Sequence, residues 1–256
     1  MLVVAWSAVS ALGVGFLTGF LLSWKYAMFP AFFALLVVFF ILNRKVGKAL
    51  QERMMVVSQT MNRPAQARSP EQRDRLVRQR LFKAVEEIQA IRDDFKNKAL
   101  FVEHGLNGQI GVLYFNLKEF EKARGFLENA SKSWVQQAWE PRAMLGVLQY
   151  KKKDFEAMDT TFEKVSRKAE KQGLMWSLWA YLHWKTGNAD KAIEVLNRGK
   201  EVLGEKDEKL LTNLLNLQNG KKMVMKGYGE VWYQFQLEMP PIMLKQRGGN
   251  VKFQRR

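Results

Sequence analysis

Side chains that could carry catalysis or bind a metal are few and scattered in this sequence. The chain has no cysteine and only two histidines, His104 and His183, so disulfides, thiolate zinc sites and cysteine nucleophiles are excluded. The adjacent carboxylates Glu86–Glu87 and Asp93–Asp94 lack an accompanying nucleophile or metal cluster, which makes them weak evidence for acid–base catalysis. We therefore expect no enzyme, no cofactor and no metal site, and we expect His183 to be a packed or hydrogen-bonded side chain.

The net charge of +16 raises nucleic-acid binding as an alternative function. The distribution of the charge argues against it, because residues 101–219 are nearly neutral, with 18 basic and 16 acidic side chains. The excess lies in residues 44–83, with eleven basic and three acidic side chains, and in residues 220–256, with eight and two. We expect no nucleic acid as a partner. A membrane enzyme is a third and weaker alternative, because the apolar stretches carry no catalytic polar residues.

A long apolar stretch opens the chain, and within residues 2–42 the only charged side chain is Lys25. A helix of that length would measure about 60 Å, twice the hydrocarbon thickness of about 30 Å. The sequence therefore predicts a transmembrane hairpin over 1–43, with helices over 2–23 and 27–42. The connection carries residue types typical of the membrane interface, namely Trp24, Lys25 and Tyr26. A cleaved signal peptide, the alternative, would need basic residues ahead of the apolar stretch, and none is present there.

The basic run that follows the second apolar helix predicts the orientation. Positive charge collects on the cytoplasmic side, so residue 44 onward and the N-terminus are both expected in the cytoplasm. We expect a multi-pass protein of the bacterial inner membrane. Three small residues, Ala11, Gly15 and Gly19, share one face of the first helix and would let it pack closely on the phenylalanine-rich second helix. Homodimerisation through the same glycines is the alternative.

Residues 44–69 are predicted to form a basic juxtamembrane linker. Within 43–57 an apolar face opposes a basic face, a pattern typical of a helix lying on anionic lipid. The apolar face consists of Val46, Ala49, Leu50, Met54 and Val57. The lipid-contacting face consists of Arg44, Lys45, Lys48 and Arg53. The alternative is that this segment simply continues the second span, and residues 58–70 are polar and expected to be a linker.

A helix start follows the linker, with Ser69 as N-cap, Pro70 in the first position and Gln72 three residues after the cap. The predicted helix covers 70–99. Its apolar residues recur at helical spacing and must be buried against another element. They are Leu81, Ala84, Val85, Ile88, Ile91 and Phe95.

The remainder of the chain repeats itself at intervals of 35 and 34 residues. Small residues recur at Gly111, Gly146 and Ala180. A second set recurs at Ala123, Met158 and Ala192. A third, apolar set recurs at Leu127, Phe162 and Leu196.

This pattern resembles the tetratricopeptide repeat, whose period is about 34 residues and which places small residues where paired helices touch. The resemblance covers about 104–206 and implies an all-α solenoid of three to four helix pairs within a domain over 70–219. The helix over 70–99 and the segment after 207 would serve as caps, since stacked repeats need them. The repeats diverge from the family, because the proline usual near a repeat's end is absent at Val135, Glu170 and Gly204.

The resemblance implies that partners bind along the first helix of each pair. The corresponding groove residues are Val112, Phe115, Val147, Tyr150, Lys151, Tyr181, Trp184, Lys185 and Leu215. The family's lysine–asparagine carboxylate clamp is absent, because Gly108 and Val112 stand at its positions. An aromatic groove with a basic edge suits an apolar protein segment.

An apolar groove must also be covered when it is unoccupied. The C-terminal tail, 220–256, carries aromatic residues over 228–244, and either this stretch or the helix over 70–99 could cover the groove. Self-coverage and a groove free for a partner are both retained as alternatives. The expected function is a membrane-anchored adaptor or scaffold that binds proteins at the cytoplasmic membrane face.

Overall fold

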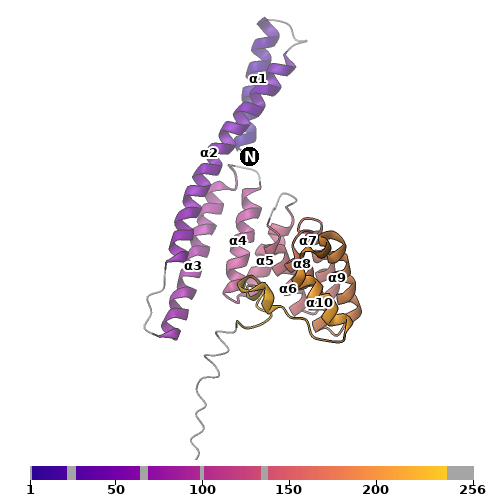
Figure 1. Cartoon of the computed structure of the whole chain (residues 1–256). Coiled ribbons are helices and arrows are strands. Elements are labelled where there is room, and N and C mark those ends of the chain that lie inside the picture. The colour runs from indigo at the N-terminus through magenta and orange to yellow at the C-terminus, as the bar shows by residue number, and fades with distance from the viewer. Residues whose placement is uncertain (1, 22–26, 64–68, 99–100, 134–137, 241–256) are drawn as a thin grey trace, which may run out of the picture. The chain divides into compact units, whose positions relative to one another are not determined.

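The computed structural model describes residues 2–21, 27–63, 69–98, 101–133 and 138–240. Within these ranges the regular elements are helices, with no strand, so the predicted all-α class is confirmed. The chain forms two compact units, unit 1 (Met1–Gln136) and unit 2 (Gln137–Arg256), and Figure 1 labels their helices. The predicted interfacial residues Trp24, Lys25 and Tyr26 and the basic chain end after 240 lie outside the described residues.

The helices of unit 1 are α1 (Leu2–Leu21), α2 (Met28–Asn62), α3 (Pro70–Phe95), α4 (Val102–Asn116) and α5 (Phe120–Ser131). The helices of unit 2 are α6 (Glu140–Lys151), α7 (Phe155–Ser166), α8 (Gly173–Lys185), α9 (Ala189–Leu203), α10 (Glu208–Gln218) and the short α11 (Glu230–Tyr233). Along unit 1 each helix packs against the next. The boundary between the units falls inside the predicted repeat domain over 70–219, and the described part of the tail belongs to unit 2.

Helix α1 packs against α2 through small residues, as expected. A Cβ added to Gly15 would lie 3.1 Å from the Cβ of Ala31, and Ala11 and Gly19 are buried. Phe39 is half-buried, but the other four phenylalanines of α2 do not provide this contact. Their side chains at 29, 32, 33 and 40 are 63–82% exposed on the protein. The hairpin therefore closes by close approach of two backbones, with the large rings turned outward.

Helix α2 continues without a break to Asn62, so the prediction of a linker beginning at residue 58 is wrong. The apolar face of 43–57 explains the continuation, because Leu50 and Val57 pack into a core shared with α3 and α4. This is the alternative in which the juxtamembrane segment prolongs the second span. The helix ends at Asn62, and the backbone of the next residue, Arg63, is extended, because the following Pro64 disfavours the helical conformation of the residue before it.

Helix α3 begins as predicted, with the Ser69 side chain accepting a hydrogen bond from the Gln72 amide at 3.2 Å. Its predicted apolar stripe is buried between α2 and α4. The fully buried members are Ala84, Val85, Ile88, Ile91 and Phe95. The helix ends at Phe95, four residues earlier than predicted.

The first two of the predicted small residues lie at close contacts between consecutive helices. A Cβ on Gly111 of α4 would lie 2.7 Å from the Leu127 side chain of α5. A Cβ on Gly146 of α6 would lie 2.5 Å from the Phe162 ring of α7. The small set and the apolar set found in the sequence therefore face each other in these two pairs.

The turn that joins the two helices of each pair also recurs at the sequence interval. The residues with positive φ are Lys118 (63°), Lys153 (62°) and Gly187 (86°), spaced by 35 and 34 residues. In each turn the amide of the next residue bonds to a carbonyl five residues earlier, at 3.0 Å. The periodicity is thus a property of the backbone as well as of the side chains.

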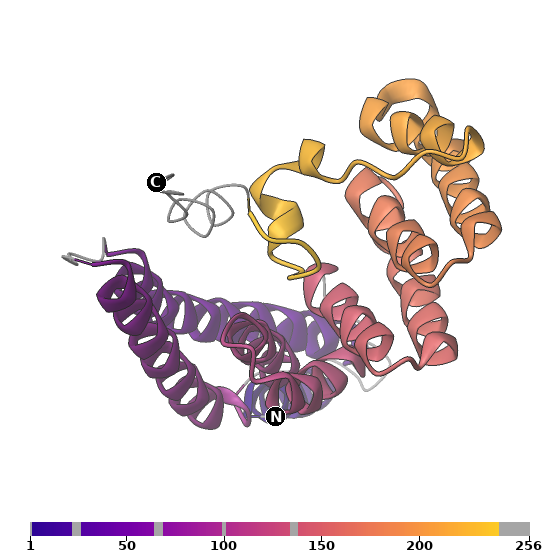
Figure 2. The same ribbon diagram turned by 90° about the horizontal axis from the view of Figure 1, so that it is seen from below.

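In unit 2, α6 packs on α7, α8 packs on α9, and α10 contacts both α8 and α9. Helix α8 is apolar on all sides and buried from Gly173 to His183, as a helix surrounded by others must be. The chain after α10 turns back across these helices, as the yellow segment in Figure 2 shows. This segment, residues 221–240, is called the return segment below.

Candidate partner-binding surfaces

The predicted groove residues do not form one open surface. Phe115 is 0% exposed and meets the edge of Phe120, 5.5 Å away between ring centroids. Val112, on the same helix, is half-buried. In unit 1 these residues therefore contribute mainly to the packing of α4 on α5.

The groove residues of unit 2 divide into a covered centre and an open edge. Val147 and Tyr181 are at most 1% exposed, whereas Leu215 is 59% exposed. Tyr150 and Trp184 are half-buried, and Lys151 and Lys185 are exposed. The Lys185 ammonium lies 4.9 Å from the Trp184 ring centroid and 5.2 Å from that of Tyr181. The predicted basic edge beside aromatic rings is thus present within this unit.

The return segment covers the centre of this surface. Trp232 is 0% exposed and packs edge-on against Tyr181, with centroids 4.8 Å apart. The Glu238 carboxylate accepts a hydrogen bond from the Tyr181 hydroxyl at 2.8 Å and another from Trp232 Nε1 at 3.0 Å. Phe235, also 0% exposed, lies 5.9 Å from the Trp139 ring. The structure therefore supports the self-covered alternative for unit 2.

Further polar contacts hold the return segment along its length. The hydroxyls of Tyr228 and Ser177 are 2.7 Å apart, and the Val224 amide donates to Asn213 Oδ1 at 2.7 Å. Burial raises the pKa of Tyr228 well above the usual tyrosine range. Burial, and then the hydrogen bond to Glu238, does the same for Tyr181. The segment is therefore held by aromatic packing and by satisfied buried donors rather than by surface charge.

His183 is packed and hydrogen-bonded, as predicted. It is 5% exposed, and its Nε2 lies 2.8 Å from Asp159 Oδ1, which also accepts a hydrogen bond from Trp179 Nε1 at 2.7 Å. Beside it, Arg198 donates two hydrogen bonds to the Glu163 carboxylate, at 2.7 and 2.9 Å. These hydrogen bonds join α7 to α8 and α9, which gives the polar groups a structural role.

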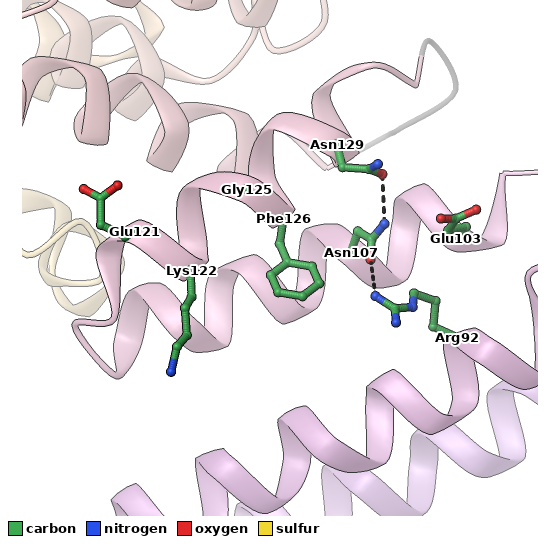
Figure 3. A pocket seen from close by; sticks show the side chains of 8 residues that line it. All are labelled: Arg92, Glu103, Asn107, Glu121, Lys122, Gly125, Phe126 and Asn129. Carbon is green, nitrogen blue, oxygen red and sulfur yellow. Dashed lines mark hydrogen bonds between the residues drawn. The ribbon is translucent and has the colours of Figure 1, made fainter.

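An open pocket of about 420 Å³ in unit 1 lies between α3, α4 and α5, and sequence reasoning missed it. A hydrogen-bonded chain crosses it (Figure 3): Arg92 donates to Asn107 Oδ1 at 3.1 Å, and Asn107 Nδ2 donates to Asn129 Oδ1 at 2.8 Å. Asn107 is 3% exposed. An asparagine at a buried helical position is the one sequence signal that could have pointed here, because a buried amide requires polar partners.

One aromatic ring, Phe126, and two cations, Arg92 and Lys122, line the same pocket. Phe126 stacks on the neighbouring ring of Tyr114, with centroids 5.6 Å apart. The Arg92 guanidinium lies 5.9 Å from the Phe126 centroid, and the Lys122 ammonium lies 5.7 Å from that of Tyr114. The carboxylates of Glu103 and Glu121 complete the lining. With donors, acceptors and ring faces together and no net charge, the pocket suits a segment of polypeptide better than a single ion.

Neither protein-family models nor curated proteins gave a match to this chain. The described residues form a helical protein in which two helices, α1 and α2, are long and apolar enough to cross a membrane. Of the most apolar 18 residues of each helix, 22% are buried within the protein in α1 and 0% in α2. Function is therefore inferred from the chain's own residues.

Proposed function

We propose that this protein is a membrane-anchored adaptor of the tetratricopeptide-like class, which holds a protein partner at the cytoplasmic face of a bacterial inner membrane and helps to assemble a membrane complex. One observation carries the proposal: an apolar hairpin with its large side chains turned outward is continuous with a helical domain built from repeated pairs. The helix that would cross the bilayer, α2, also supplies Val57 to the core of unit 1.

Support for the anchor comes from exposure. Phe20, Phe29 and Phe40 are 79%, 82% and 75% exposed on the protein. A soluble protein rarely exposes so large a continuous apolar surface, and a core helix would bury these rings. Lipid is the environment in which their exposure costs nothing.

Support for the tetratricopeptide-like class comes from three features that share one interval. The small residues, the apolar residues opposite them and the positive-φ turns all recur at 35 and 34 residues. Close contacts at Gly111 and Gly146 lie where the family's paired helices touch. Helix α3 packs on α4 as an N-terminal cap would.

Support for the orientation comes from charge and from one backbone contact. The basic excess of residues 44–83 favours the cytoplasm for the domain. The Leu2 amide donates to the Asn97 carbonyl at 2.9 Å, so the start of α1 and the end of α3 belong to the same side of the membrane. In sphaeroplasts, protease added from outside is expected to leave α3 to α10 intact, and external digestion of these helices would refute the orientation.

Partner binding is assigned to the unit 1 pocket, because the return segment covers the centre of the predicted groove in unit 2. Site-specific photocrosslinking in intact membranes tests this assignment. A photoreactive residue at Lys122 is expected to capture one defined protein, and the same residue at Lys185 is expected to capture the return segment of its own chain. A probe at Lys200, exposed on α9, is the control. Identical crosslinks from Lys122 and Lys200 would refute the assignment.

A further inference from the structure

Asn97 and Lys98, just after α3, are hydrogen-bonded to the start of the apolar hairpin. The Leu2 amide donates to the Asn97 carbonyl at 2.9 Å, and the Val3 amide donates to the Lys98 carbonyl at 3.3 Å. These are two of the amides that a helix start leaves without an intrahelical partner. Figure 1 shows the start of α1 beside the end of α3 and the start of α4.

The height of this contact along the hairpin follows from helix geometry. Gly15 of α1 lies against Ala31 of α2, and the two helices run in opposite directions (Figure 1). Leu2 is thirteen residues before Gly15, or about 20 Å along the axis. Thirteen residues after Ala31 is Arg44, the first residue of the basic run. Asn97 and Lys98, which bond to the start of α1, therefore lie at the level where the apolar surface ends and the charge begins.

The charges at this level are predominantly positive. Arg44, Lys45 and Lys48 are exposed on α2. Among the nearby carboxylates, Asp94 pairs with Arg53 and Asp93 pairs with Lys96 at 3.3 Å, while Glu103 in the first turn of α4 is exposed. Lys98 adds a further ammonium, 4.8 Å from the Phe95 ring centroid.

Phe101 adds an aromatic ring beside these charges. Its backbone is in the left-handed region, with φ 65°, which is unfavourable for a residue with a Cβ. Its side chain is 41% exposed. An aromatic ring near basic residues at the end of an apolar helix is the arrangement typical of the membrane–water interface.

We propose that Lys98, just after α3, and Phe101, just before α4, dock on anionic lipid headgroups and complete a collar begun by Arg44 and Lys45. The proposal rests on the membrane anchoring proposed above. Anionic phospholipid is the occupant because the collar is continuous with the lipid-facing hairpin and carries the opposite charge. The collar holds α3, α4 and α5 at a fixed height above the bilayer.

The absence of cysteine permits a direct test by site-directed spin labelling of the full chain in phosphatidylcholine vesicles, with or without phosphatidylglycerol. Nitroxides are attached to Phe33→Cys, Phe101→Cys and Asn116→Cys, and depth is measured from collisions with oxygen and with a water-soluble nickel chelate. Asn116, exposed at the far end of α4, is the aqueous reference. The label at 101 is expected at headgroup depth, with several-fold fewer nickel collisions than the label at 116.

Charge is tested with Lys98→Glu and with the matched control Lys83→Glu, which lies about 20 Å further back along α3. In vesicles containing phosphatidylglycerol, Lys98→Glu is expected to move the label at 101 toward water, whereas Lys83→Glu leaves it in place. Equal nickel accessibility at 101 and 116, or equal effects of the two charge reversals, would overturn the collar. A label at 33 that fails to enter the bilayer would instead refute the membrane anchoring itself.

Discussion

The close contact between α4 and α5 makes the effect of adding one methyl group at Gly111 predictable. The added Cβ would lie 2.7 Å from Leu127 Cγ and Cδ2 and 3.2 Å from the Leu127 amide nitrogen. Leu127 is 1% exposed, so its side chain has little space into which it can move. Gly111→Ala therefore forces the two helices apart or moves Leu127 off its preferred rotamer.

Two opposing free-energy changes determine the size of the effect. Alanine in a helix interior is favoured over glycine by about 1 kcal/mol. Overpacking a well-packed core costs about 1–3 kcal/mol. The net expectation is a destabilisation of up to about 2 kcal/mol, which corresponds to as much as a 30-fold change in the local opening equilibrium. The α4 and α5 amides should exchange faster by up to that factor, as measured by hydrogen-exchange mass spectrometry on the membrane-reconstituted chain.

The matched control lies on the same helix. A Cβ on Gly105 would meet nothing within 4 Å, so Gly105→Ala should gain helix propensity alone and slow exchange by about 5-fold at most. The two substitutions are chemically identical and are expected to act in opposite directions. If Gly111→Ala slowed exchange as Gly105→Ala does, the close packing of α4 on α5 would be refuted.

Three further predictions concern unit 2. Glu238→Ala strands two buried donors at a cost of about 1–3 kcal/mol, which should appear as faster exchange of the return segment, whereas Glu230→Ala should have no effect; equal effects would exclude the proposed hydrogen bonds as its attachment. Because burial raises the pKa of Tyr228, its contribution to stability is complete below about pH 10, the unfolded value, and is lost as pH rises toward the folded value. Tyr228→Phe should therefore reduce the fall in melting temperature as pH rises above about 10, measured by thermal denaturation at a series of pH values. An unchanged fall in melting temperature would contradict the assignment. Lys153→Gly should stabilise the α6–α7 turn by about 1 kcal/mol because φ there is 62°, while Gly187→Ala should destabilise the equivalent turn; thermal melts that moved in the same direction would count against the shared turn geometry.

The helix content and the main contacts were predictable because they depend on local patterns. The capping signal at Ser69 needs only four residues, and the apolar stripe of α3 needs only helical spacing. The 35- and 34-residue intervals are enough to predict Gly111 and Gly146 as positions of close helix contact, because close helix packing requires a residue without a large side chain. These features depend on neighbours in sequence or on a period that the sequence displays directly.

The features that were not predictable depend on which distant surfaces meet. The face of 43–57 was apolar enough for either lipid or protein, and only the presence of α3 alongside decided that Leu50 and Val57 enter a protein core. Trp232 covers Tyr181 although the two residues are 51 positions apart in the sequence. A periodic sequence pattern does not predict a contact of this kind. The pocket around Asn107 is formed by three helices. In the sequence, only single polar residues at otherwise apolar positions could have indicated it.

The continuity of α2 determines how the anchor and the domain are connected. Its 35 residues span about 52 Å, of which about 30 Å would cross the hydrocarbon core. The remaining four turns lie along α3, where Arg53 pairs with Asp94 and Val57 is buried. A polar linker would let the domain sample many heights above the membrane, whereas a single helix packed at both ends does not.

The hydrogen bonds from the start of α1 to Asn97 and Lys98 add a second attachment, to the other helix of the hairpin. In the proposed membrane-anchored arrangement, these two attachments fix the tilt of α3, α4 and α5 as well as their height, so the pocket between them is held at one distance from the bilayer and in one orientation.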